Sequence, residues 1–406
     1  MFFGLGSLAL LAIWVRRPAV SRELLAIAVV LGLLGVYGTL IGPGNPGLVF
    51  TVLVYFAAPV LYLLCAVATT QRMLFWFFRA ASVSTIAIGV LILLFVGGEA
   101  ERIPQLVPEW LEEATGLGAT FGGGSSQARF YGLSSLAALG PMWAASLLVR
   151  QDDLLPRWGV RAVCALLAAG AAFVSSREAI VLVIVAAPLL GLIVNAVLRP
   201  RPVSTPVRLS PKLIVAFLAT CSVASVLAIT LAPRIAAFGP VVRALDSVRA
   251  FLTGPTGSGS VDQSIRSEQA WKLIQAWQQN PVFGAGFGAR VPDYSRTSER
   301  PWVLELQYHL FLFNVGLVGV LFVGVLACLA AILLKRAAAS APALLPSLTV
   351  TSVAGLSMLI ANATNPYLQA PGHVWALFLP LALANLMTLT GRDTTAVAGL
   401  PPRNVE

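Results

Sequence analysis

Apolar stretches of about 20 residues recur along this 406-residue chain. A stretch of that length spans a bilayer as an α-helix, because about 20 residues at roughly 1.5 Å each cover the hydrocarbon core. We count eleven: about residues 1–15, 24–43, 47–68, 78–98, 131–149, 159–175, 179–198, 213–232, 307–334, 343–362 and 372–391. Only 11% of the residues are charged, against about 25% in soluble domains. The pattern predicts an all-α polytopic membrane protein with about eleven transmembrane helices, or twelve if another precedes the short first one.

Basic residues gather in every second loop between these stretches. If residues 16–22 face the cytoplasm, every loop on that side carries arginine or lysine, whereas the short loops 44–46 and 363–371 on the other side carry no charge. Arginine and lysine accumulate on the cytoplasmic side of membrane proteins. The N-terminus is therefore expected outside and the C-terminus inside. Most of the net charge of +10 then belongs to membrane-flanking loops, so we expect no nucleic-acid partner.

Two segments on the expected outer side are longer than the rest. Residues 99–130 hold five glutamates, and residues 233–306 form one large loop. Within that loop the apolar spacing predicts an amphipathic helix over 267–279, with Trp271 on its apolar side, ending at the Asn-Pro pair 280–281. A glycine-rich run follows over 284–288. A tight turn is its favoured interpretation, and a cradle of backbone N–H groups for an anion is the alternative.

The chain is expected to divide into four parts: transmembrane helices 1–8 over 1–232, the large extracytoplasmic loop with its amphipathic helix over 233–306, transmembrane helices 9–11 over 307–391, and a cytoplasmic tail over 392–406. Four cysteines lie far apart within apolar stretches. Their spacing indicates neither a disulfide framework nor a metal site.

Arg177 and Glu178 are the only charged residues between Ala162 and Leu198. A charge held near hydrocarbon costs about 2.5–3.5 kcal/mol on insertion scales, so such a pair is expected to have a function. The two residues stand where one expected span ends and the next begins, on the outer side. Arg177 is therefore expected to meet an anion, with simple pairing to Glu178 as the alternative.

Two further arginines are expected on the same side. Arg129 opens the fifth span, and Arg266 precedes the amphipathic helix. A guanidinium stays charged and offers a planar fork that pairs with two phosphate oxygens. Three such groups at one membrane face suit a phosphate or diphosphate ligand. The alternative for each arginine is that it extends to the interface or pairs with a nearby acid.

Glu305, Tyr308 and His309 stand at the start of the ninth span. Residues four apart share a helix face, so Glu305 and His309 are expected together, with Tyr308 beside them. A carboxylate or imidazole at this place suits a general base that takes a proton from a sugar hydroxyl. The alternative is a Glu–His hydrogen bond that only fixes the helix end. The pair lacks the further ligands that zinc needs, so we expect no metal and no cofactor.

In their order these motifs resemble the O-antigen ligase/polymerase superfamily, the integral-membrane enzymes of bacterial polysaccharide assembly. The resemblance covers roughly residues 129–319. It rests on the motifs Arg129–Gly132, Ser176–Ala179, Arg266 with Trp271, Asn280–Gly288, Glu305–Tyr308 and Gly316–Gly319. Their order, together with the large loop between the eighth and ninth spans, makes the resemblance specific.

The resemblance implies a GT-C-like helical fold in the bacterial inner membrane, with the active site facing the periplasm. It also implies a glycan on undecaprenyl diphosphate that is transferred to an acceptor hydroxyl without a metal. The partners would be the donor and acceptor glycans, the lipid bilayer and a chain-length regulator protein. Arg177 and Arg266 would bind the diphosphate with help from Arg129, since cations stabilise charge that develops on a leaving group. Glu178 would support Arg177.

One position distinguishes the polymerases from the ligases of this superfamily. In the ligases a histidine typically stands eleven residues before the first glycine of a Gly-x-x-Gly pair. Counted from Gly316, that residue here is Glu305. A glutamate is similar to the polymerases, which join repeat units of O-antigen, capsule or exopolysaccharide, with Glu305 as base and Tyr308 in support. His309, one helical turn later, leaves a ligase that transfers glycan to a lipid or protein as the alternative.

A small-anion transporter is the third interpretation, since distant members of the superfamily have been linked to anion uptake. Transporters typically have paired repeats and broken helices near the bilayer midplane. The sequence has no convincing internal repeat, and its charged candidates gather at one membrane face. An interfacial enzyme is therefore favoured.

Overall fold

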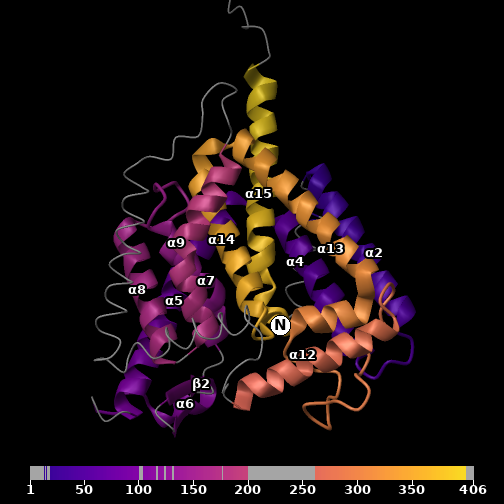
Figure 1. Ribbon diagram of the computed structural model, residues 1–406. Coiled ribbons are helices and arrows are strands. Elements are labelled where there is room, and N and C mark those ends of the chain that lie inside the picture. The colour runs from indigo at the N-terminus through magenta and orange to yellow at the C-terminus, as the bar shows by residue number, and fades with distance from the viewer. Residues whose placement is uncertain are drawn as a thin grey trace, which may run out of the picture.

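The structure is a computed structural model (Figure 1), which describes residues 13, 15, 19–99, 104–115, 118–122, 125–129, 132–175, 177–199 and 261–398. Within these ranges, the backbone alone is described for residues 114–129, 178, 261–264 and 391–398. The expected span 213–232, nearly all of the span 1–15, residues 233–260 of the large loop and the end of the tail lie outside the described residues.

Seven described helical segments are long and apolar enough to cross a membrane. They contain α2 (Arg22–Ile41), α3 (Leu48–Val52) joined through the π-helical turn η1 (Leu53–Ala57) to α4 (Ala58–Ala68), α5 (Gln71–Glu99), α9 (Glu178–Leu198), α13 (Gln307–Ser340), α14 (Leu345–Asn362) and α15 (Trp375–Ala398). The shorter apolar helix α8 (Trp158–Val174) accompanies them. Each matches a stretch expected from the sequence, so the chain is a multi-pass helical membrane protein.

The expected span 131–149 is shorter than the sequence predicts. It consists of the 3₁₀ turn η2 (Leu133–Ser135) and the 11-residue helix α7 (Leu136–Ser146). Every residue of α7 except Ala144 is buried, because α7 packs against α5, α8, α9 and α14. Eleven residues cover about half of a bilayer core. The apolar sequence of α7 therefore reflects burial among helices, not a full crossing.

Residues 118–129 depart from the all-α expectation. Strands β1 (Gly118–Gly122) and β2 (Ser125–Arg129) form an antiparallel pair, with Gly118 opposite Arg129. The short helix α6 (Glu109–Thr115) precedes them. Two short strands leave the fold predominantly helical, but the segment before η2 contains a β-hairpin.

The helices pack in two groups that α14 and α15 join (Figure 1). On one side α7 contacts α8 and α9 and α5 contacts α8; on the other, α13 contacts α2, and α2 contacts α4. α14 contacts α7 and α9, whereas α15 contacts α13 and α4. The loop that joins α14 to α15 therefore lies where the two groups meet.

Helix α13 is kinked at Gly316, whose backbone lies at φ 60° and ψ −161°. The part before the kink runs across one end of the bundle beside α12 (Val261–Gln279), and the part after it follows the bundle (Figure 1). A Cβ atom at Gly316 would lie 2.4 Å from the carbonyl oxygen of Val282. Glycine is needed here, since other residues pay for a positive φ and for the close approach.

The glycine-rich run Gly284–Gly288 fills this kink as a tight turn, with Gly284, Gly286 and Gly288 at φ 79°, 85° and 74°. Its N–H groups donate to backbone carbonyls at 2.8–2.9 Å: Gly284 to Asn280, Ala285 to Phe313, Gly286 to Asn314 and Phe287 to Gly38. The favoured interpretation of the run as a tight turn is confirmed. The alternative of an anion cradle is wrong for these four groups, because each already has an acceptor.

Helix α12 begins at Val261, six residues before the expected helix 267–279, and ends as expected just before Asn280. Leu273 on α12 is buried in one apolar cluster with Leu310 and Phe313 from the start of α13. Trp271 is 61% exposed, so it does not belong to the apolar side on which the sequence placed it. The cluster fixes α12 against the part of α13 that precedes the kink.

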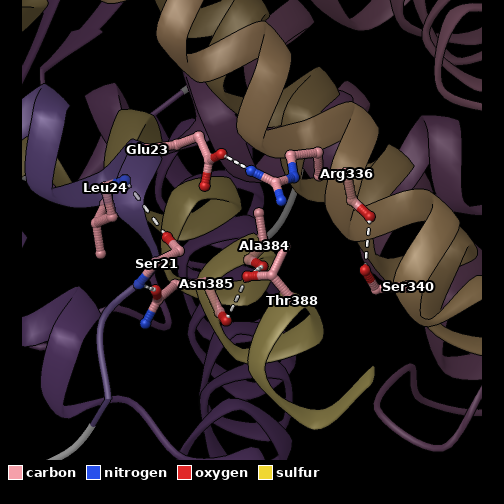
Figure 2. Close-up of polar contacts among 8 residues, drawn as sticks. All are labelled: Ser21, Glu23, Leu24, Arg336, Ser340, Ala384, Asn385 and Thr388. Atoms are coloured by element: carbon pink, nitrogen blue, oxygen red, sulfur yellow. Dashed lines mark hydrogen bonds and ion pairs between the residues drawn. The ribbon is translucent and has the colours of Figure 1, made fainter. Parts of the chain in front are cut away.

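Polar contacts join α2, α13 and α15 at the opposite end of the bundle (Figure 2). Arg336 of α13 forms an ion pair with the buried carboxylate of Glu23 on α2. The N–H of Ser21 donates to Oδ1 of Asn385 on α15 at 2.9 Å, and Oγ of Ser21 caps α2 by accepting from the N–H of Leu24 at 3.3 Å. These contacts fix α2, α13 and α15 against one another at the end of the bundle that lies away from the kink in α13.

Candidate functional site

Glu305 lies between two arginines at the end of the bundle where α12 meets α13. Its Oε2 is 3.4 Å from Nε of Arg266 on α12, and its Oε1 pairs with Nη1 of Arg296. The side chains of Arg266, Arg296 and Glu305 are 33%, 27% and 29% exposed. Both oxygens of this carboxylate therefore face a guanidinium at the edge of solvent. The sequence singled out Arg266 and Glu305 separately and missed Arg296.

The expectation that Glu305 and His309 share a helix face is wrong. Helix α13 begins at Gln307, with Leu306 as its N-cap residue, so Glu305 lies outside the helix. The ion pairs to Arg266 and Arg296 hold Glu305 in the preceding bend, whereas His309 is half-buried in the first turn of α13. The four-residue spacing does not bring the two side chains together, because the helical periodicity starts after Glu305.

Tyr308 is directed towards α14 and not towards Glu305. Its hydroxyl donates to the carbonyl oxygen of Leu359 at 2.5 Å. This bond links the first turn of α13 to the last turn of α14, just before the loop between α14 and α15. Tyr308 thus contributes to the position of that loop.

Tyr367 lies in the 3₁₀ turn η5 (Tyr367–Gln369). Its phenol is influenced by the charges of two arginines, Arg177 and Arg266, that the sequence predicts to bind one ligand. Burial raises the pKa of Tyr367 to about 12, and the positive charges of Arg177 and Arg266 both act in the opposite direction. Charges act on a neighbouring pKa only at short range in a partly buried setting. Arg177, at the start of α9, and Arg266, on α12, therefore both lie near enough to Tyr367 for their charges to act on its phenol. No motif in the sequence singles out Tyr367.

Arg177 precedes α9 and serves as its N-cap residue through its backbone, with a half-buried side chain. It therefore stands at the positive end of the α9 dipole, where an anion is favoured. Glu178 is the first residue of α9, and Arg129 is the last of β2. Their side chains are outside the described part of the structure, so the roles expected for Glu178 and Arg129 stay predictions.

An open pocket of about 410 Å³ adjoins Glu305. Its lining comes from the segment before α13 and from the loop between α14 and α15: Arg296, Thr297, Glu299, Arg300, Val303, Leu304, Glu305, Pro366 and Gln369. Gln369 joins the two walls, because its Nε2 donates to the carbonyl oxygen of Leu304 at 2.7 Å. The pocket is lined by side chains of both charges, and one of them, Glu305, pairs with Arg266. Such a lining suits a polar ligand.

His373, in the 3₁₀ turn η6 (Pro371–His373), forms two hydrogen bonds near this cluster. Its Nε2 lies 2.8 Å from Oγ of Ser134 in η2, and its Nδ1 lies 3.0 Å from the carbonyl oxygen of Tyr367. His373 is one of two histidines in the chain. The sequence favoured the other, His309, because that residue follows Glu305 closely.

Among the described residues, no group of three or more His, Cys, Asp or Glu side chains is placed to hold a metal ion. Glu305 instead lies between Arg266 and Arg296, and the charge of Arg177 acts on Tyr367. Such a set suits an anionic or sugar ligand. Comparisons of the chain with models of protein families and with curated proteins find no match.

Proposed function

We propose that this chain is a membrane glycosyltransferase that polymerises oligosaccharide repeat units carried on undecaprenyl diphosphate. It would act without a metal at the outer leaflet of the bacterial inner membrane, in a GT-C-like helical fold. The observation that carries the proposal is that Arg266, held at Glu305 by an ion pair, and Arg177 both act through their charges on one residue, Tyr367. Two cations from separate parts of the chain thus act at one end of a membrane bundle.

Glycosyl transfer from a lipid diphosphate needs such cations. The acceptor hydroxyl attacks the anomeric carbon, and the bond from that carbon to the diphosphate oxygen breaks. The leaving diphosphate then gains negative charge. Two guanidinium groups would neutralise that charge where it develops, and each can pair with two phosphate oxygens. The N-terminal end of α9, beside Arg177, adds a further positive potential.

The charge distribution supports an outward-facing site. The loop 363–374, which carries Tyr367, holds no Asp, Glu, Lys or Arg. The opposite end of the bundle holds Arg22 and the pair Lys335–Arg336. Basic residues favour the cytoplasmic side. This distribution supports the outer leaflet as the side on which Arg177, Arg266 and Tyr367 lie, where a lipid-linked donor would be presented.

Glu305 favours a polymerase over a ligase, since a glutamate stands where the ligases typically have histidine. In a polymerase the acceptor is another repeat unit, which needs a polar space next to the donor. The pocket beside Glu305 offers that space. Glu305 and His309 are the groups that the sequence nominates to take the acceptor's proton.

The direct test is reconstitution of the purified full-length protein in liposomes with labelled undecaprenyl-diphosphate repeat units. A ladder of lengthened glycans on the lipid is the expected product. Transfer of the glycan to a second lipid or to a protein, with no ladder, would make the chain a ligase. Intact donor after incubation, together with uptake of small anions into the liposomes, would contradict both and support a transporter.

A further inference from the structure

Ser134 and His373 form a side-chain pair that joins two distant parts of the chain. Oγ of Ser134 lies 2.8 Å from Nε2 of His373, across 239 residues of sequence. Ser134 belongs to η2, which follows the β1–β2 hairpin, and His373 belongs to the turn that leads into α15. Both side chains are half-buried. A ligand at the end of the bundle can therefore reach them.

The second hydrogen bond of His373 fixes the state of its ring. Nδ1 lies 3.0 Å from the carbonyl oxygen of Tyr367. A carbonyl oxygen only accepts, so Nδ1 carries a hydrogen atom. In the neutral imidazole Nε2 is then an acceptor, and the hydroxyl of Ser134 donates to it. This is the arrangement of an oriented general base: one ring nitrogen is held by a fixed acceptor, and the other takes a proton from a hydroxyl group.

The imidazole lies next to the arginine cluster. Tyr367, whose carbonyl oxygen accepts from Nδ1, is the residue on whose phenol the charges of Arg177 and Arg266 both act. Gln369, in the same loop, donates to the carbonyl oxygen of Leu304 and ties the loop to the segment that carries Glu305. The candidate base and the candidate diphosphate cations are thus parts of one assembly.

Glu305 is less accessible to an incoming hydroxyl. Its Oε2 faces Arg266 and its Oε1 faces Arg296, so an incoming hydroxyl would have to share either oxygen with a guanidinium group. At His373, by contrast, a hydroxyl group already occupies the position from which a proton is given up. An acceptor hydroxyl needs only to replace the hydroxyl of Ser134.

We infer, on the basis of the proposed function, that His373 is the proton acceptor of the transfer, and that Ser134 occupies the acceptor-hydroxyl position in the absence of substrate. The acceptor hydroxyl gives its proton to Nε2 of His373, and its oxygen forms the new bond to the anomeric carbon. The bond from that carbon to the diphosphate oxygen breaks, and its electron pair leaves with the diphosphate. The imidazolium then returns its proton to solvent.

Two substitutions of His373 separate proton transfer from a purely structural role. His373→Asn retains a donor near the position of Nδ1, which can keep the bond to the carbonyl of Tyr367. His373→Gln places an acceptor near Nε2 for Ser134. Neither amide takes up a proton. If His373 only holds the two segments together, at least one variant stays active. If it is the base, both lose roughly 10²–10⁴-fold in turnover, while wild-type binding of an undecaprenyl-diphosphate probe is retained.

Ser134→Ala and Ser135→Ala form a matched pair in the same turn. Ser134→Ala removes the hydroxyl that occupies the acceptor position, so it is expected to lower turnover, by up to about tenfold and by much less than His373→Asn. Ser135→Ala is the control and is expected to keep wild-type turnover. His309→Asn compares the two histidines of the chain, and it is expected to be less damaging than His373→Asn.

The experiment is the liposome assay with wild type and these variants, with folding checked by thermal unfolding in detergent. An inactive wild type would overturn the proposed function and this inference with it. An active wild type with either His373 variant within tenfold of it would overturn this inference alone. A Ser134→Ala variant as inactive as His373→Asn, with glycan found covalently on Ser134 in the wild type, would also overturn it, because the serine would then be the nucleophile.

Discussion

Nε of Arg266 lies 3.4 Å from Oε2 of Glu305, so two residues that the sequence suggested for separate roles form one ion pair. Both side chains are about one-third exposed. An exposed pair of this kind contributes at most about 1 kcal/mol. A diphosphate with several charged oxygens would therefore compete readily with Glu305 for Arg266. In the proposed mechanism, this ion pair would keep Arg266 at the site until an anionic ligand arrives.

Arg177→Gln and Arg266→Gln are each expected to reduce glycan chain extension by roughly 10²–10³-fold, because each removes a cation from the developing charge of the leaving group. Arg290→Gln is the matched control, since Arg290 is an exposed arginine of the same outer segment and lies outside the cluster around Tyr367. The measurement is the length of glycan made by cells or liposomes with equal amounts of membrane-inserted protein. Wild-type glycan length from either cluster variant would contradict diphosphate binding.

Glu305→Gln is expected to lower turnover about tenfold and to raise the KM for the donor, because Arg266 and Arg296 both lose their partner. The effect should be smaller than that of His373→Asn, which removes the proton acceptor itself. Glu299→Gln, at another acid that lines the same pocket, serves as the control. The kcat and KM values of these variants show whether Glu305 or His373 is the base. If Glu305→Gln is as inactive as His373→Asn at saturating donor, Glu305 is the base.

Gly286→Ala is expected to destabilise the protein by at least about 2 kcal/mol. Gly286 has φ 85°, which costs other residues about 1–2 kcal/mol, and an added Cβ would lie 2.3 Å from Cα of Gly42. Gly324→Ala is the comparison, because a Cβ at Gly324 of α13 meets no atom within 4 Å. Thermal unfolding in detergent measures both. Equal melting temperatures for the two variants would show that the turn does not need glycine at 286.

Tyr367 predicts a dependence of stability on alkaline pH. Its pKa is raised to about 12 in the folded protein, against about 10 for an unfolded chain. The folded state favours the neutral phenol, so this contribution to stability is complete below about pH 10 and is lost as the pH rises through 12. Tyr367→Phe should lack this loss, and Arg177→Gln should enlarge it, since Arg177 lowers this pKa. The free energy of unfolding, measured across about pH 9–12, checks this prediction. If it falls with pH equally in the wild type and in Tyr367→Phe, the prediction is contradicted.

The sequence predicted the long apolar helices correctly because about 20 apolar residues with basic flanks leave few alternatives to a membrane span. It failed at α7, where burial among other helices produces the same composition as burial in lipid. It also failed at Glu305, because ion pairs with Arg266 and Arg296 hold that residue outside the helix. Helical spacing contains no information about such contacts.

Tyr367 and His373 were missed for a related reason. Each stands in a short uncharged loop, and its importance comes from partners that α9, α12 and η2 bring to the same end of the bundle. A single sequence does not record which loops meet. One feature of the sequence could have indicated His373. It is one of two histidines in the chain, and it stands in the loop on the side of the membrane where the arginines were expected.

The most direct measurement for the central claim is the amount of undecaprenyl diphosphate released per glycosidic bond formed by the wild-type protein in liposomes. Polymerisation from a lipid diphosphate predicts equal amounts, and it predicts that release and bond formation are lost together when Arg177 and Arg266 are both replaced by glutamine. Glycosidic bonds formed without release of the lipid diphosphate, or release unaffected by the double substitution, would contradict the account.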